Sequence, residues 1–112
     1  MIIKHNSKNI EISEVRKLSK FGKATGLMFH SSKECPAMLF EFGSPTKMKI
    51  HSLFVFFRFA AVWLDDKNNI IDIKIVKPFR LSISCKEPFY KLVEIPLNKK
   101  YKKITKILFD KN

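Results

Sequence analysis

The sequence predicts a mainly β domain, a small antiparallel β-sandwich or partly open barrel that carries one N-terminal α-helix. Strand-like runs of alternating apolar residues recur along the chain with turn-forming residues between them, whereas a convincing helical pattern occurs only once. The chain has 112 residues, 46% of them hydrophobic and 11 of them phenylalanine, which is enough to fill one core and too little for two. We therefore expect a single domain over residues 1–112.

A hairpin and the helix come first. Residues 2–3 and 10–12 are rich in isoleucine and flank a polar stretch at 6–9, where asparagine favours a turn. Ser13 can then cap a helix over about residues 13–25. The apolar positions near one face of that helix are Val15, Leu18, Phe21 and Ala24, with Gly26 placed to end it.

The rest of the chain predicts strands. Residues 37–42 form a strand that ends at the turn cluster 43–45. The phenylalanine-rich run 53–64 forms one long buried strand or two successive ones. A hairpin loop at 65–69 joins that run to alternating isoleucines at 71–75. Further strands are predicted at 81–84, 93–97 and 104–109.

The chain is strongly basic, with 22 Lys and Arg against 10 Asp and Glu and a net charge of +12. Such a surface attracts polyanions without reading their sequence. Only three of the cations are arginines, the residue type that forms paired hydrogen bonds with bases and phosphates. We therefore interpret the charge mainly as background composition.

The densest basic feature is the C-terminal segment 98–112, which holds six lysines and one aspartate. An aromatic ring among lysines suits single-stranded nucleic acid, because the ring stacks on a base and the ammonium groups meet phosphates. The candidate nucleic-acid contacts are Lys99, Lys100, Tyr101, Lys102 and Lys103. The alternative, which we favour, is a solvated connection in which Tyr101 is anchored on the core.

The sequence contains no motif for catalysis or metal binding. The three histidines are scattered, and Cys35 and Cys85 lack the paired short spacings of a zinc site. No nucleophile elbow, phosphate-binding glycine loop or zinc-protease motif occurs. We therefore expect no catalytic residue, no metal and no cofactor, and a disulfide is permitted but unsupported.

Targeting signals are also missing from the sequence. The N-terminus lacks the apolar core of a secretory signal, and the longest apolar run, residues 53–64, is shorter than the ~20 residues that cross a bilayer. We therefore predict a cytoplasmic protein with reduced thiols and no membrane contact. The exposed edges expected of its sheets permit a homodimer.

Four segments carry a resemblance to a known family. They are Gly-Leu-Met-Phe at 26–29, Ala-Met-Leu-Phe-Glu-Phe at 37–42, Val-Trp-Leu-Asp at 62–65 and Lys-Pro-Phe at 77–79. Over about residues 13–97 the chain resembles the family called domain of unknown function 192 (DUF192). The resemblance implies a small, mostly β sandwich, and it implies no established activity.

The chain departs from the family's pattern where a catalytic group would be sought. Aligned without gaps, the family's Pro-Leu-Asp stretch falls on residues 58–60, so Ala60 stands where the family has aspartate. The family's Trp-Met-Lys-Asn-Thr stretch then falls on 51–55, which lacks its lysine and asparagine. Alternatively, residues 48–49 represent its Met-Lys with an insertion after them, and the sequence leaves both alignments open.

The most consistent interpretation is a non-catalytic module that binds a small ligand or a protein. His51 precedes the phenylalanine run, where a strand end beside a pocket would suit a titratable ring. The candidate ligand-binding residues are Met28, His51, Arg58 and Trp63. Two alternatives stay open: weak, non-specific nucleic-acid binding through the basic surface, and an enzyme that uses a pocket of the family.

Overall fold

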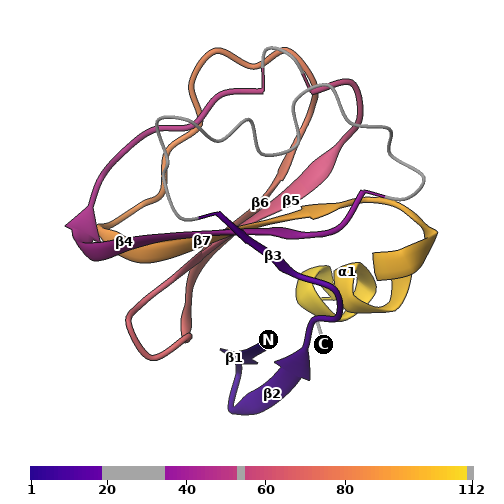
Figure 1. Cartoon of the computed structure of the whole chain (residues 1–112), viewed down its shortest axis with the longest axis horizontal. Coiled ribbons are helices and arrows are strands. Elements are labelled where there is room, and N and C mark those ends of the chain that lie inside the picture. The colour runs from indigo at the N-terminus through magenta and orange to yellow at the C-terminus, as the bar shows by residue number, and fades with distance from the viewer. Residues whose placement is uncertain (19–34, 53–54, 111–112) are drawn as a thin grey trace.

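The computed structural model describes residues 1–18, 35–52 and 55–110, which form a two-stranded sheet, a five-stranded sheet and a C-terminal helix (Figure 1). The elements are β1 (Ile2–His5), β2 (Lys8–Glu11), β3 (Arg16–Leu18), β4 (Met38–Thr46), β5 (Phe59–Leu64), β6 (Ile70–Val76), β7 (Phe89–Pro96), the 3-10 turn η2 (Lys99–Tyr101) and α1 (Lys102–Phe109). The predicted mainly β fold is confirmed. Within the described residues, no helix has the length and apolar character needed to cross a membrane.

Strand β7 lies at the centre of the five-stranded sheet, whose order is β3-β4-β7-β5-β6. It pairs antiparallel with β4 on one side and with β5 on the other, and β5 continues into β6 through a hairpin. Residues 92–96 of β7 are all buried. The β3–β4 pair is parallel, so the sheet is mixed and not purely antiparallel as predicted.

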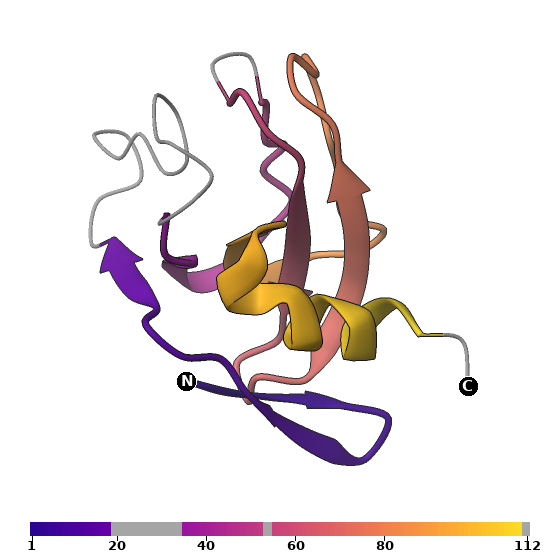
Figure 2. The ribbon, with the colours of Figure 1, turned by 90° about the vertical axis from the view of Figure 1, so that its right-hand side faces the viewer.

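The sheet is covered on both faces, which gives the molecule three layers (Figure 2). On one face, Val62 of the sheet packs in a cluster with Ile3 of the hairpin and Leu108 of α1. On the other face, Trp63 packs in a second cluster that includes Val55 from the loop before β5. Because the described part of this second layer consists of loops, the predicted sandwich or barrel stays a prediction.

Both predicted hairpins are confirmed. β1 pairs with β2 around Asn6 and Ser7, whose φ values of 50° and 65° fit a tight turn. β5 pairs with β6 around a turn in which the Asp65 carboxylate accepts the backbone N–H groups of Lys67 and Asn69 at 2.9 and 2.8 Å. Local turn chemistry therefore fixes the register of each pair.

The helix predicted over 13–25 is wrong in the part that the structure describes. Residues 16–18 form β3, and the Arg16 N–H donates to the Ala37 carbonyl at 2.8 Å. The backbone of Glu14 has a φ of 54°, in the left-handed region, which is incompatible with a right-handed helix through this residue. Pairing with β4 thus overrides the local helical pattern, while residues 19–25 lie outside the described residues.

The last predicted strand, 104–109, is also wrong, because these residues form most of α1. Tyr101 and Leu108 are buried and Ile104 is half-buried, and their spacing places all three on one side of a helix. The lysines of α1, Lys102, Lys103 and Lys106, are exposed. The C-terminal apolar residues therefore follow the helical period and not the strand period.

Three other strand predictions are corrected in extent. The strand at 37–42 is confirmed as β4 but continues through the predicted turn to Thr46, with an irregularity in its pairing. Only residues 59–64 of the run 53–64 form a strand, since 55–58 form a loop and 53–54 lie outside the described residues. The segment 81–84 contributes only an isolated bridge, Ile83 with Ile50.

The buried hydroxyl of Tyr101 joins three parts of the chain. It accepts the Ala37 N–H at 2.8 Å and lies 3.0 Å from the Ser13 carbonyl oxygen, to which it can donate. Ala37 directly precedes β4 and Ser13 follows the β1–β2 hairpin, so one side chain fixes the C-terminal helix to both. Burial raises the pKa of the Tyr101 hydroxyl, although the hydrogen bond from Ala37 acts in the opposite direction.

Tyr101→Phe should therefore lower the free energy of unfolding by about 1–3 kcal/mol, because it leaves a buried N–H and a buried carbonyl without this partner. Urea denaturation measures the loss. Tyr90→Phe is the matched control, since the Tyr90 hydroxyl forms no hydrogen bond with the described residues. Equal stabilities of the two variants would contradict the role given to Tyr101.

Candidate functional site

Two loops cover the face of the sheet opposite α1 (Figure 1). We call residues 47–58 loop A and residues 77–88 loop B. Ile50 of loop A and Ile83 of loop B exchange two backbone hydrogen bonds of 2.9 and 2.8 Å. Val55 packs on the buried side of these loops against the sheet. The two loops therefore form one layer.

Ser52 fastens loop B to loop A although it lies in an irregular segment. Its side chain is fully buried, and its hydroxyl donates to the Lys77 carbonyl at 2.7 Å and accepts the Arg80 N–H at 2.8 Å. Its backbone carbonyl accepts the Phe79 N–H at 2.7 Å, and its N–H donates to the Arg80 carbonyl at 2.9 Å. One serine thus satisfies the polar backbone of a complete turn in loop B.

The turn held by Ser52 exposes an aromatic residue in a strained conformation. Phe79 has a φ of 63°, which is rare for a bulky side chain, and its ring is 58% exposed. The ring of Phe56 in loop A is also 58% exposed and meets Phe79 edge to face at 5.7 Å between centroids. Leu81 is 78% exposed. These three residues, Phe56, Phe79 and Leu81, are called the aromatic surface below.

The two loops around the aromatic surface carry mostly positive charge, with Glu87 near the end of loop B as their one carboxylate. No Asp or Glu occurs in residues 42–64 or 73–86. Two of the three arginines of the chain, Arg58 and Arg80, lie in the loops, and both are exposed. The exposed cations of the two loops are Lys47, Lys49, Arg58, Lys77, Arg80 and Lys86. The loops therefore present apolar rings within a basic rim.

Beneath the loops, a buried acid interrupts the apolar face of the sheet. Glu94 on β7 pairs with Met38 of β4 and Ala61 of β5, and it is only 8% exposed. Burial raises the pKa of its carboxyl to about 8. Among the described residues, Glu94 has no hydrogen-bond or ion-pair partner. The row of cross-strand partners that runs through Glu94 ends at Arg16 on β3 and at Lys74 on β6. Burial therefore favours the neutral carboxyl, and ionising Glu94 in the folded chain costs stability.

The described residues among those predicted to bind a ligand differ in exposure. His51 and Arg58 are exposed on loop A, close in sequence to Ser52 and Phe56. Trp63 is fully buried on β5 beneath the loops, and its indole N–H has no acceptor among the described residues. Met28 lies outside the described residues. The role of these four residues in binding a ligand stays a prediction.

The predicted nucleic-acid contacts form the turn η2 and the first turn of α1. Tyr101 is fully buried and therefore has no ring face to stack on a base. Lys100 forms an ion pair with Glu14. Lys99, Lys102 and Lys103 are exposed, so the segment presents lysines without the aromatic platform that the sequence suggested.

Neither cysteine takes part in a disulfide. Cys35 is buried and Cys85 half-buried, and burial raises the pKa of both thiols. Within the described residues, no group of three or more His, Cys, Asp or Glu side chains could hold a metal ion.

Sequence reasoning missed the residues that define the aromatic surface. Phe56 belongs to a run predicted as core, and its 58% exposure contradicts that prediction. Ser52 and Phe79 were not singled out, because their roles depend on contacts between two loops distant in sequence. The available signal was a serine among apolar residues, since a buried hydroxyl needs hydrogen-bond partners.

The family comparison agrees with the resemblance seen in the sequence. The model of DUF192, a family described as "Uncharacterized ACR", matches residues 1–103. The chain belongs to the DUF192 family. No protein of curated function matches it significantly.

Two solved structures share the fold of this DUF192 member. One, from Sinorhizobium meliloti 1021 and described as a proposed transcription regulator, has a TM-score of 0.73 and 17% identity, covering 93% of this chain and 82% of that chain. A protein of unknown function from Novosphingobium aromaticivorans DSM 12444 gives a TM-score of 0.69 and 15% identity, covering 93% and 76%. At these identities the likeness shows the fold alone.

The position where the gapless alignment places the DUF192 aspartate lies inside the protein. Ala60 is fully buried on β5, paired with Ile75 and Ile95, on the face that packs against the hairpin and α1. The aromatic surface lies on the opposite side of the sheet. Under that alignment the alanine fills core space and leaves the loops unchanged.

Glu94→Gln should raise the free energy of unfolding at neutral and alkaline pH. The carboxyl pKa of about 8 in the folded chain lies above the ordinary value of 4.5, so this group favours folding most below pH 4.5. Its contribution falls as the pH rises from 4.5 to about 8 and is constant above that. Within this window, each pH unit lowers the free energy of unfolding by up to roughly 1.4 kcal/mol. Urea denaturation from about pH 4 to about pH 9 measures this loss.

The matched control is Glu41→Gln. A hydrogen bond from Lys17 holds the pKa of the Glu41 carboxyl below its ordinary value, so any stabilisation it gives is lost on acidification, which is the opposite direction. If the free energy of unfolding depends on pH identically in wild type and Glu94→Gln, then Glu94 is solvated and the prediction is wrong.

Proposed function

We propose that the chain is a non-catalytic protein-binding module that docks an acidic segment of its partner on the aromatic surface. The observation that carries this proposal is the exposed pair of Phe56 and Phe79, which the buried Ser52 holds in place. Large exposed aromatic side chains gathered on one surface mark interaction sites more often than isolated ones do.

The exposed rings supply binding energy. Each ring is 58% exposed, and full burial of a phenylalanine contributes about 1.5–3 kcal/mol. Covering both rings therefore contributes on the order of 1 kcal/mol per ring. Leu81, at 78% exposure, extends the apolar area. Anchors of this kind commonly account for most of the affinity at a protein interface.

The strain at Phe79 supports a role in binding. A non-glycine residue at positive φ costs of order 1–3 kcal/mol, and such strain concentrates at functional sites. Asparagine or glycine would occupy this position at lower cost. The chain instead places phenylalanine there and directs its ring toward solvent, where the ring gives little to the core.

The basic rim selects the partner's charge. Arg58 and Arg80 lie in the same loops as the two rings, and the six exposed cations of loops A and B outnumber their one carboxylate, Glu87. An acidic segment with leucine or aromatic side chains matches both features. Nucleic acid fits less well, because the edge-to-face contact at 67° between the ring planes gives no pair of parallel stacking faces.

Two wider expectations belong to the same proposal. We take residues 1–112 to act as one domain, and we place the protein in the cytoplasm. The two free thiols support a reducing compartment.

A random-peptide display selection with the full chain as bait tests the proposal. We expect enriched peptides to carry acidic residues together with leucine or aromatic residues. Phe79→Asn should weaken their binding by about tenfold or more, as measured by fluorescence anisotropy. Its stability should stay within about 1 kcal/mol of wild type, because asparagine tolerates positive φ.

The control variant Lys102→Gln/Lys103→Gln removes two exposed charges from α1, remote from the loops. It should change peptide affinity and its salt dependence only slightly. Selection of peptides that bind Phe79→Asn as tightly as wild type would overturn the proposal, as would tight binding of single-stranded nucleic acid that depends on Phe79.

A further inference from the structure

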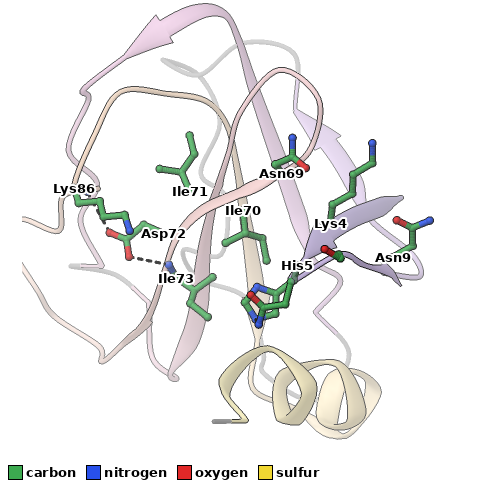
Figure 3. Close-up of a pocket in the computed structure, with 11 residues that line it drawn as sticks. Lys4, His5, Asn9, Asn69, Ile70, Ile71, Asp72, Ile73 and Lys86 are labelled. Atoms are coloured by element: carbon green, nitrogen blue, oxygen red, sulfur yellow. Dashed lines mark hydrogen bonds between the residues drawn. The ribbon is translucent and has the colours of Figure 1, made fainter. Parts of the chain in front are cut away.

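A cavity of about 500 Å³ lies between the β1–β2 hairpin and the outer edge of β6, away from the aromatic surface (Figure 3). The hairpin touches this edge at one place. The Lys4 N–H donates to the Asn68 carbonyl at 2.8 Å, and the Asn68 side-chain amide donates to the Ile2 carbonyl at 3.0 Å. Lys4 and Asn69 form a single parallel bridge there. Past this bridge the hairpin and β6 leave a wedge between them.

The hairpin side of the cavity is rich in hydrogen-bond donors. It offers an ammonium group, an imidazole, two side-chain amides and a hydroxyl, and Lys86 of loop B adds a second ammonium group. The polar residues that line the cavity are Lys4, His5, Asn6, Ser7, Asn9, Asn69, Asp72 and Lys86. The β6 side is different, because Ile70, Ile71 and Ile73 give it an apolar floor.

The carboxylate in the lining, Asp72, is already engaged. One of its oxygens accepts the Ile73 N–H at 2.9 Å and the other accepts the Lys86 N–H at 3.1 Å (Figure 3). Lys4 and Lys86, in contrast, form no ion pair within the described residues. The cavity therefore carries more positive than negative charge, and its cations are available to a ligand.

The walls of the cavity are fixed by contacts within the chain itself. The turn at Asn6 and Ser7 has both residues at positive φ, which fixes the hairpin in one tight conformation. On the other side, the Asp72 carboxylate ties β6 to loop B. A preformed site of this size is within the range of small-molecule sites, and little order has to be created on binding.

We propose that this cavity binds a small organic anion whose charged group meets Lys4 and Lys86 and whose short apolar portion lies on the isoleucines of β6. Either a carboxylate or a phosphate ester supplies the charged group. The ammonium group, the hydroxyl and the amide N–H groups on the hairpin can donate to its oxygens, because an anion offers acceptors only. Inorganic anions have no apolar portion to cover the isoleucines, so we expect organic anions to bind more tightly.

The test is an NMR titration of the full, isotope-labelled chain with hexanoate, 1-hexanol and inorganic phosphate. We expect saturable amide shifts with hexanoate at Ser7, Asn69 and Ile71, and much weaker binding of the neutral alcohol and of phosphate. Lys4→Gln/Lys86→Gln should weaken hexanoate binding about three- to tenfold, the usual range for losing two partly exposed charge pairs.

Lys102→Gln/Lys103→Gln removes the same charge from α1 and should leave hexanoate binding unchanged, and Phe79→Asn should do likewise. Equal weakening in the α1 variant would mean attraction to net charge alone and would overturn the proposal. So would shifts that rise linearly without saturation, or equal binding of hexanoate and hexanol. The two proposals fail separately, because Phe79→Asn tests the aromatic surface and Lys4→Gln/Lys86→Gln with hexanoate tests the cavity.

Discussion

The burial of β7 on both faces is the constraint from which the rest of the structure follows. β7 pairs with β4 and β5, so its backbone is satisfied within the sheet, and its side chains need cover on each side. On one side the hairpin and α1 provide regular structure whose own hydrogen bonds are internal. On the other side loops provide the cover, and their irregular backbone requires partners from side chains. Ser52 supplies those partners, and the exposed turn at Phe79 exists because Ser52 holds it.

The two covering layers differ in chemistry as well as in structure. The α1 side is apolar, with the Tyr101 hydroxyl as its main polar group, and that hydroxyl is hydrogen-bonded. The loop side contains three costly groups: the Glu94 carboxyl, the Trp63 indole N–H, which has no acceptor among the described residues, and the strained Phe79 backbone. On the α1 side, the Thr105 hydroxyl is a buried polar group without a hydrogen-bond partner among the described residues. The strained backbone and the buried carboxyl, both common at functional sites, lie on the loop side. The apolar packing of the α1 side offsets the destabilisation from these groups.

How much of this was predictable depends on whether the deciding contact is local. The hairpin at 65–69 was predictable because Asp65 bonds backbone groups two and four residues away and the isoleucines alternate. Strand β3 was not, because three residues gain their strand conformation from β4, which lies about twenty positions later. The helix α1 had a readable signal in the spacing of Tyr101, Ile104 and Leu108 that the strand interpretation overlooked. Phe79 and Phe56 could not be placed, since hydrophobicity alone predicts burial and only the loop geometry exposes them.

Loop B links the two proposed binding sites. Near its start, the Ser52 hydroxyl and carbonyl hold the backbone N–H groups of Arg80 and Phe79, and near its end, the Asp72 carboxylate holds the N–H of Lys86. Between these points Ile83 pairs with Ile50, and the Ser84 carbonyl accepts a hydrogen bond from the Lys74 ammonium group. A ligand that meets Lys86 in the cavity therefore acts on the loop that presents Phe79. Because these hydrogen bonds hold loop B at several points, the cavity and the aromatic surface share one fixed element of the structure.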